Sequence, residues 1–182
     1  MKIAILNGNP SDKGAFERYL NELERGLIER KHSVANLRLR EMNVHDCLGC
    51  FTCWLKTPGR CAQRDDGQKV CRSYIDADLA IFASPLIMGH SSALLKRSHD
   101  RLFALIHPYF MQVGGEMHHR PRYRHYPRLA VLLEKGGDAD DEDVAIVKEM
   151  YRRDAINLNT SLAGPWLSNR PVREIIHALD RL

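Results

Sequence analysis

The chain has 182 residues, of which 44% are hydrophobic and 27% charged, and its formal net charge is +4 at pH 7. This length suits one α/β domain with a substantial buried core, so we expect a single domain over residues 1–182. So small a charge disfavours a nucleic-acid-binding protein, and the longest apolar stretch, residues 79–89, is too short to span a bilayer. We expect no nucleic acid partner and no membrane insertion.

Strands and helices alternate along the chain. Short apolar runs bounded by turn residues indicate strands, and apolar residues that recur every three or four positions indicate helices. The predicted strands cover residues 2–6, 33–39, 78–84 and 128–133, and a fifth is expected over 157–163 because the alternation requires one. The predicted helices cover residues 16–30, 68–74, 94–105, 139–154 and a last segment with Pro171 in its first turn.

This alternation predicts an α/β fold, a mostly parallel sheet covered by helices on both faces. In such sheets ligands bind beyond the C-terminal ends of the strands. The loops over residues 7–14, 84–92 and 134–138 follow predicted strands and meet that description. We therefore expect the binding site at this edge of the sheet.

The first loop, residues 7–14, joins a strand to a helix and contains two glycines. Its backbone N–H groups and the helix N-terminus suit a phosphate, and Asn9, Ser11 and Lys13 add donors and positive charge. The loop matches neither the G-x-G-x-x-G dinucleotide pattern nor the P-loop, which disfavours both kinds of site. A plain turn in which Ser11 or Asp12 caps the helix is the alternative.

The second loop, residues 84–92, is apolar at its tip, where Leu86, Ile87 and Met88 lie. Exposed apolar side chains on a loop need a flat apolar ligand or a neighbouring surface to cover them. Ligand contact and ordinary packing explain this tip equally well from the residues alone.

Four of the five cysteines are clustered with the spacing C-x2-C-x2-C-x7-C. Thiolates this close can surround one metal centre, but a cysteine-rich turn that binds nothing has the same spacing. Zinc is disfavoured because a separated second pair of ligands is lacking. Cys71 falls outside the run and is expected to be structural. Clustered cysteines without a secretory segment favour a reducing, cytoplasmic location. The clustered residues are Cys47, Cys50, Cys53 and Cys61.

Several motifs occur together in one order. They are Gly8-Asn9-Pro10-Ser11, the cysteine run followed by Asp65-Asp66, Ser84-Pro85, Leu95-Lys96 and Asp100-Arg101. In this order they resemble the NADPH-dependent FMN reductase family of the flavodoxin-like superfamily, close to the iron–sulfur flavoproteins, over residues 1–137. The resemblance implies a doubly wound five-stranded parallel sheet of order 2-1-3-4-5 with FMN across the strand ends. It also implies electron transfer from NAD(P)H and a homodimer or homotetramer with the flavin near a subunit interface.

The resemblance also assigns roles to individual residues. Asn9, Ser11 and Lys13 would hold the FMN phosphate. The residues that would flank the isoalloxazine ring are Pro85, Leu86, Ile87, Met88 and Gly89. The residues that would approach its far edge are Lys135, Gly136 and Gly137. The run formed by Cys47, Cys50, Cys53 and Cys61 matches the one that binds a [4Fe–4S] cluster in iron–sulfur flavoproteins, although relatives in the wider family keep similar cysteines without a cluster.

Two departures from the family pattern bear on affinity for FMN. Phosphate loops of the family often carry an arginine in the region of Asp12 and an Asn-Thr pair where this chain has Ala15-Phe16. The ring-contacting loop often has an aromatic residue where this chain has Ile87. The sequence therefore predicts that FMN is held weakly.

Residues 107–128 form an insertion rich in His, Arg and Tyr. A solvated arm or a dimer clasp is the simplest interpretation. Two alternatives stay open: a metal site that uses His118 and His119, and attraction of the NADPH 2′-phosphate by arginines. Those arginines are Arg120, Arg122 and Arg124.

The leading hypothesis is an FMN-dependent NAD(P)H oxidoreductase. It would pass hydride from the nicotinamide to the flavin and on to a quinone, a flavin or another small-molecule or protein acceptor, without a named catalytic side chain. One alternative is an iron–sulfur flavoprotein electron carrier, although flavodoxin-type carriers tend to be acidic and this chain carries +4. The other is a cysteine-based metal or redox module with a degenerate flavin site.

Overall fold

Three central strands carry long apolar runs because both of their faces are buried. β1 (Lys2–Asn7), β3 (Leu79–Ile87) and β7 (Arg128–Glu134) pair in parallel, and Ile5, Phe82 and Val131 within them have no exposed surface. The computed structural model describes residues 1–182, and its main sheet has the order β2-β1-β3-β7-β8, with all five strands parallel. Counted along this sheet, the order is the predicted 2-1-3-4-5, and the flavodoxin-like fold is confirmed.

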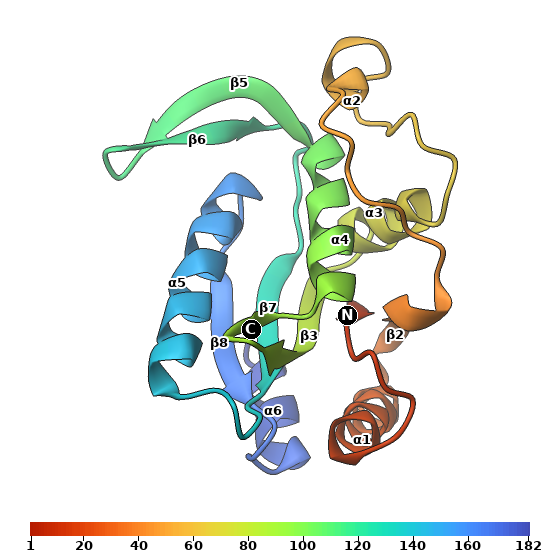
Figure 1. Cartoon of the computed structure of the whole chain (residues 1–182), viewed down its shortest axis with the longest axis vertical. Coiled ribbons are helices and arrows are strands. Elements are labelled where there is room, and N and C mark those ends of the chain that lie inside the picture. The colour runs from red at the N-terminus through yellow and green to blue at the C-terminus, as the bar shows by residue number, and fades with distance from the viewer.

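The remaining elements complete the alternation of strands and helices (Figure 1). The other strands are β2 (Ser33–Arg38), β4 (His90–Ser91), β5 (Ile106–Val113), β6 (Glu116–Pro121) and β8 (Leu162–Leu167). The α-helices are α1 (Ala15–Glu29), α2 (Thr52–Leu55), α3 (Gly67–Ile75), α4 (Ala93–Arg101), α5 (Asp141–Asn157) and α6 (Val172–Leu179). Two 3-10 helices, η1 (Leu39–Glu41) and η2 (Leu102–Leu105), follow β2 and α4.

Helices cover both faces of the sheet, and each face has its own core. On one face α1 and α6 bury apolar residues such as Leu20 and Ile175 against the sheet. On the other face α3, α4 and α5 bury residues such as Val70, Leu95 and Tyr151. The buried positions of α1 recur at helical spacing, as the sequence predicted. None of the helices combines the length and apolar character that a membrane span requires.

The fifth strand lies later in the chain than the predicted 157–163. β8 covers Leu162–Leu167, because α5 continues to Asn157 and keeps burying one face through Ala155. The sequence hid this strand because it contains Gly164 and Pro165, residues that disfavour strands. As an edge strand, paired only with β7, β8 tolerates a proline that lacks a backbone N–H.

The predicted 84–92 loop and the predicted insertion both contain hairpins that the sequence analysis did not predict. β3 continues through Ile87 and turns back at Met88 and Gly89 into the short antiparallel β4, so much of the predicted 84–92 loop is a hairpin. The insertion over residues 107–128 holds a second hairpin, formed by β5 and β6. We call residues 106–121 the arm. Figure 1 places the arm and α2 at one end of α4, and β4 at the other.

Candidate functional site

The predicted binding loops do meet at the C-terminal edge of the sheet. The backbone N–H of Gly8 donates to the Ala83 carbonyl at 2.8 Å, and the Ser92 hydroxyl donates to the Gly8 carbonyl at 2.5 Å. A Cβ added at Gly8 would lie 2.7 Å from the Leu95 Cβ, so the first loop needs a glycine to pack this closely against α4. These contacts join the first loop to the hairpin between β3 and β4.

The third loop lies on the other side of that hairpin. A Cβ added at Gly136 would lie 3.9 Å from the Leu86 carbonyl oxygen, and one added at Gly89 would lie 2.5 Å from the Asp143 carboxylate on α5. Lys135 is exposed and forms a 2.7 Å ion pair with Asp141. The hairpin is therefore flanked by residues 7–14 on one side and by residues 134–143 on the other.

Within the first loop, side chains cap alternate backbone N–H groups. The Asn7 side chain accepts from Asn9 N at 3.0 Å, Asn9 from Ser11 N at 3.3 Å, and Ser11 from Lys13 N at 3.1 Å. No side chain caps the N-terminus of α1, whose N-cap residue is Gly14. The first backbone N–H groups of this helix are therefore open to an anion.

A buried acidic residue stands beside this loop, which the sequence analysis missed. Glu17, in the first turn of α1, is 5% exposed and accepts two 3.1 Å hydrogen bonds from Arg40 and one of 3.1 Å from the Asn9 amide. Burial acts to raise the pKa of Glu17, but the hydrogen bonds from Arg40 and Asn9 outweigh it and lower the pKa. The carboxylate is thus kept charged and paired, and it fixes the Asn9 side chain.

The hairpin presents only part of its apolar sequence to the outside. Leu86 is 3% exposed, whereas Ile87 is 43% and Met88 is 88% exposed. Met88 and Gly89, the two central residues of the turn, both have positive φ angles. The turn is therefore tight, and the Met88 side chain projects outward. The apolar surface of this edge is therefore formed mainly by Ile87 and Met88.

The cysteine loop, residues 47–61, lies at the opposite end of α4. The Trp54 indole donates to the Phe103 carbonyl at 3.1 Å and stacks on the Phe103 ring with centroids 4.0 Å apart. The nine residues of α4 separate this end from Ser92 by about 14 Å of helix. Within one chain, the cysteines and the predicted flavin loops therefore lie at different ends of the molecule.

A buried ion pair anchors the segment that follows the cysteines. Arg101 donates to both oxygens of Asp65 at 2.6 and 2.8 Å, and their side chains are 1% and 0% exposed. Burial acts to raise the pKa of Asp65, but hydrogen bonds from Arg101, His45 N and Gly67 N lower it to about 2. This pair ties α4 to the start of α3.

The four clustered cysteines do not form a gathered ligand set. No group of three or more His, Cys, Asp or Glu side chains is arranged to hold a metal ion. Cys47 and Cys50 are exposed, while Cys53 and Cys61 are half-buried. The assignment of a cluster to Cys47, Cys50, Cys53 and Cys61 therefore stays a prediction, and it requires the loop to rearrange around the iron.

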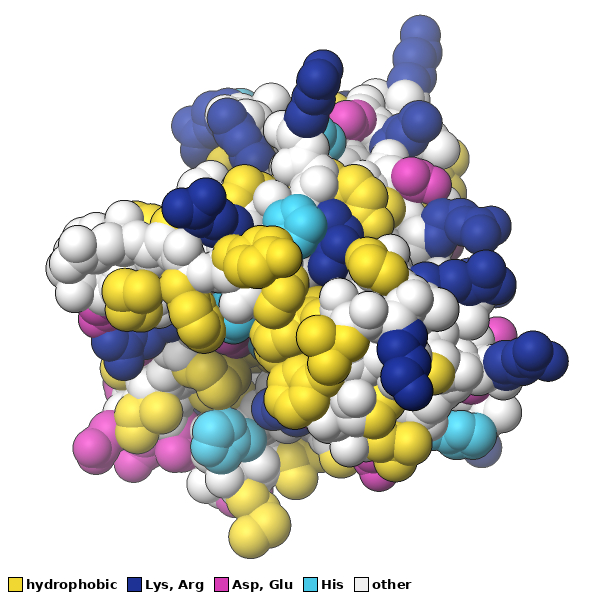
Figure 2. All heavy atoms as spheres, turned by 90° about the horizontal axis from the view of Figure 1, so that it is seen from above, with side chains coloured by type: hydrophobic (Ala, Val, Ile, Leu, Met, Phe, Trp, Pro, Cys, Tyr) yellow, Lys and Arg dark blue, Asp and Glu magenta, His cyan; other side chains and the backbone are white.

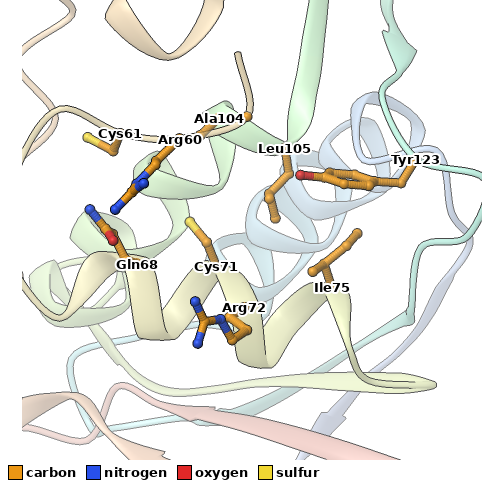
Figure 3. Close-up of a pocket in the computed structure, with 10 residues that line it drawn as sticks. Arg60, Cys61, Gln68, Cys71, Arg72, Ile75, Ala104, Leu105 and Tyr123 are labelled. Carbon is orange, nitrogen blue, oxygen red and sulfur yellow. The ribbon is translucent and has the colours of Figure 1, made fainter. Parts of the chain in front are cut away.

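Cys71, expected to be only structural, shares a cavity with Cys61 (Figure 3). The cavity also contains Arg60 and Arg72, and the Cys71 thiol donates to the Arg101 carbonyl at 3.3 Å. Burial raises the pKa of Cys71 to about 12, so this thiol is protonated at neutral pH. Cys71 is therefore an unreactive neighbour of the cysteine loop.

The arm packs on the cysteine loop and on the end of α5. His118 Nδ1 contacts the Asn157 amide oxygen at 3.1 Å, whereas His119 Nδ1 contacts the His107 carbonyl at 2.8 Å. The two histidines thus do not converge on one metal site. Arg120 and Arg122 donate to the carbonyls of Phe110 and Ile106, so both guanidinium groups already have partners within the arm.

Comparison with known proteins identifies the family. The family model described as NADPH-dependent FMN reductase matches residues 1–133. The chain belongs to this family. The chain is 29% identical over 101 residues to an iron–sulfur flavoprotein of Methanocaldococcus jannaschii, covering 56% of this chain and 51% of that protein. An iron–sulfur flavoprotein of Archaeoglobus fulgidus is 29% identical over 107 residues, covering 59% and 48%. The matches thus span about half the length of these curated relatives.

Solved structures of this FMN reductase fold superpose over nearly the whole chain. An NAD(P)H:quinone oxidoreductase from Methanothermobacter marburgensis has a TM-score of 0.66 at 19% identity and covers 99% of this chain and 94% of that one. An FMN-dependent NADH-azoreductase from Bacillus anthracis, in complex with FMN, has a TM-score of 0.65 at 15% identity, with coverages of 99% and 98%. At these identities the likeness establishes the fold.

Proposed function

We propose that this chain is an FMN-dependent NAD(P)H oxidoreductase. The observation that carries the proposal is the uncapped N-terminus of α1 beside the exposed apolar tip of the β3–β4 hairpin, in a member of the FMN reductase family. A phosphate at the helix end and a flat ring on the hairpin would satisfy both features. The residues present therefore fit FMN.

The phosphate would be held by the first loop. Ser11 and Lys13 are exposed and free to reach an anion, while Asn9 is buried and shapes the loop through its bond to Glu17. Lys13 supplies positive charge. Arg40 pairs with the buried Glu17 carboxylate, and this pairing reduces the repulsion between that carboxylate and the phosphate. With a single lysine and no arginine in the loop, we propose that FMN is held weakly.

The ring would lie along the hairpin, flanked by the Pro85–Leu86–Ile87–Met88–Gly89 segment. Ile87 and Met88 supply the apolar contact, because Leu86 faces the core. Lys135, Gly136 and Gly137 would border the far side, where a Cβ added at Gly136 would lie 2.7 Å from the Asp138 carboxylate. These residues orient the ring and exclude water, and we assign no side chain as a general base.

Bound FMN would supply the chemistry, accepting hydride from a nicotinamide and passing electrons to a quinone, a flavin or another acceptor. Flavin titration tests the binding step. Ser11→Ala combined with Lys13→Ala should weaken FMN binding about tenfold or more, because charge-assisted hydrogen bonds are lost. Lys148→Ala, an exposed lysine on α5, is the control and should bind like the parent chain. Absence of flavin binding, or an unaffected double variant, would refute the phosphate assignment.

Activity is tested separately on the FMN-loaded protein. We expect oxidation of NADH or NADPH when a quinone or ferricyanide is present. A flavin that stays oxidised without air under excess NADH and NADPH would instead favour an electron carrier.

The cysteine run supports a second candidate function, that of an iron–sulfur flavoprotein. We propose it because the curated relatives are iron–sulfur flavoproteins and because the four cysteines match a cluster-binding run. Anaerobic reconstitution with iron and sulfide should then load about four irons per chain. Cys53→Ser should abolish loading and Cys71→Ser should not. If the parent chain loads no iron, this candidate falls and the reductase proposal stands.

We also propose a cytoplasmic location and a homodimer or homotetramer. The exposed apolar side chains of the cysteine loop and arm support association, since an exposed apolar patch commonly marks an interface. Figure 2 looks onto this end of the molecule, where hydrophobic side chains gather near the middle. Those exposed include Leu48, Phe51, Leu55, Tyr109, Phe110 and Met117. Light scattering at several protein concentrations would measure the assembly size.

A further inference from the structure

A cavity of about 360 Å³ lies where the cysteine loop, the end of α4, the arm and the end of α5 meet. It is separate from the predicted flavin loops, since none of its lining residues comes from residues 7–14, 84–92 or 134–138. Its volume falls within the range of small-molecule sites. The proposed oxidoreductase function leaves this cavity without a role.

One wall of the cavity is aromatic. Phe51 and Phe103 lie with ring centroids 6.2 Å apart, and the His119 ring of the arm lies 5.9 Å from Phe103. Trp54 backs this wall, stacked on Phe103. Rings arranged in this way offer contacts to a flat aromatic ligand.

A second part of the cavity wall holds two polar side chains without hydrogen-bond partners. His99 Nε2 and Asp154 Oδ2 are 3.6 Å apart, too far for a hydrogen bond, and their side chains are only 14% and 25% exposed. Burial lowers the pKa of His99 and raises that of Asp154, so burial favours the neutral form of each. Leaving a largely buried polar group without a hydrogen bond is unfavourable. A ligand that supplies the missing hydrogen bonds would therefore be stabilised at this site.

Asn157 adds a donor to this wall. Its amide oxygen is occupied by His118 Nδ1 at 3.1 Å and lies 3.4 Å from the His119 backbone N–H. That leaves its amide nitrogen to donate. Asp100 also lines the cavity, where it forms a 2.5 Å ion pair with Lys96. This pair adds no net charge to the wall.

We propose that this cavity binds a planar aromatic molecule that carries hydroxyl groups. Its rings would lie against Phe51 and Phe103. Its hydroxyl groups would donate to Asp154 or His99 and accept from the amide nitrogen of Asn157. The site is independent of the flavin proposal and needs no flavin for binding.

Isothermal titration of the full chain with 2,6-dihydroxynaphthalene tests this proposal. We expect saturable binding at one site per chain, undiminished when FMN is present in excess. The related compound 2,6-dimethoxynaphthalene, which has no hydroxyl donors, should bind at least tenfold more weakly. No saturable binding, displacement by FMN, or equal binding of the dimethoxy compound would each overturn the proposal.

Substitutions then locate the site. Asp154→Leu with Asn157→Leu should weaken binding at least tenfold, whereas Ile146→Ala, on an exposed part of the same helix, should leave it unchanged. Circular dichroism checks that each variant is folded.

A measurement on the unaltered chain covers the case in which the double variant does not fold. Cys47 lines the cavity and Cys50 does not, yet both are exposed. Bound 2,6-dihydroxynaphthalene should slow iodoacetamide labelling of Cys47 severalfold and leave Cys50 unchanged, as read by peptide mass spectrometry. Equal labelling of Cys47 with and without the ligand would place the molecule elsewhere and overturn the proposal.

Discussion

The two ends of α4 are held in place by different kinds of interaction. At its N-terminal end, Ser92 and Leu95 meet the Gly8 backbone at close range, so the contact depends on small residues and main-chain hydrogen bonds. At its C-terminal end, Arg101 is paired with buried Asp65, and Phe103 stacks on Trp54. The N-terminal end is therefore held by backbone contacts within the main sheet and its loops. The C-terminal end is held by side chains from the cysteine loop and the segment that follows it.

The largest effect should come from breaking the side-chain end. Arg101→Leu leaves the Asp65 carboxylate buried and unpaired, and it should lower the free energy of unfolding by about 3–5 kcal/mol. Arg97→Leu is the matched control, because Arg97 lies on the same helix and its ion pair with Asp46 is exposed, and it should cost less than about 1 kcal/mol. Urea unfolding measures both. Equal losses of unfolding free energy in the two variants would mean that the buried pair stabilises the fold no more than the exposed pair does.

A somewhat smaller effect should come from the backbone end. Gly8→Ala pushes a methyl group to 2.7 Å from the Leu95 Cβ, and overpacking of this kind costs about 1–3 kcal/mol. Flavin binding should weaken too, since the first loop must shift. Gly137→Ala meets nothing within 4 Å and serves as the control, with stability near that of the parent chain. A Gly8→Ala variant as stable as this control would contradict the close packing.

The stability that the buried Asp65–Arg101 pair gives to the C-terminal end of α4 should depend on pH. The pKa of Asp65 is lowered to about 2, so its contribution to stability is complete above its ordinary value and is lost as the pH falls toward 2. Unfolding free energies measured at several pH values below about 5 should therefore decline less steeply in Asp65→Asn than in the parent chain. Parallel pH profiles would show that Asp65 does not titrate with a lowered pKa.

The smallest expected effect concerns thiol reactivity at the side-chain end. A hydrogen bond with Thr52 lowers the pKa of Cys50, whereas burial raises the pKa of Cys53 and that of Cys71. Iodoacetamide should therefore label Cys50 first and Cys71 last. Thr52→Val should slow labelling of Cys50 a few-fold, and an unchanged rate would exclude the Thr52 hydroxyl as the cause.

The sequence predicted the backbone end far better than the side-chain end. Strand periodicity and the loops that follow each strand are local signals, so the order of the main sheet and the meeting of the three loops were confirmed. Glu17 with Arg40 and Arg101 with Asp65 join residues far apart in the chain, and no local pattern reveals such pairs. The approach of His99 to Asp154, with Nε2 and Oδ2 3.6 Å apart, was missed for the same reason.

Other errors had signals that could have been used. Gly114 and Gly115 stand between two runs with strand-forming residues, which is a known sign of a tight hairpin, yet no hairpin was predicted within the insertion. The fifth strand was misplaced because Gly164 and Pro165 interrupt its pattern. Which residues bind FMN, and whether the cysteines bind iron, still rests on the experiments proposed above.

The turn at Gly114 and Gly115 also has a practical use. Neither glycine has an atom within 4 Å of where a side chain would begin, and both have positive φ angles in an exposed turn. Open, solvent-facing turns tolerate inserted sequence better than packed elements do. A short glycine-rich epitope or a fluorescent tag inserted there would leave both cores untouched, and it would report directly whether the arm is free or covered in the assembled protein.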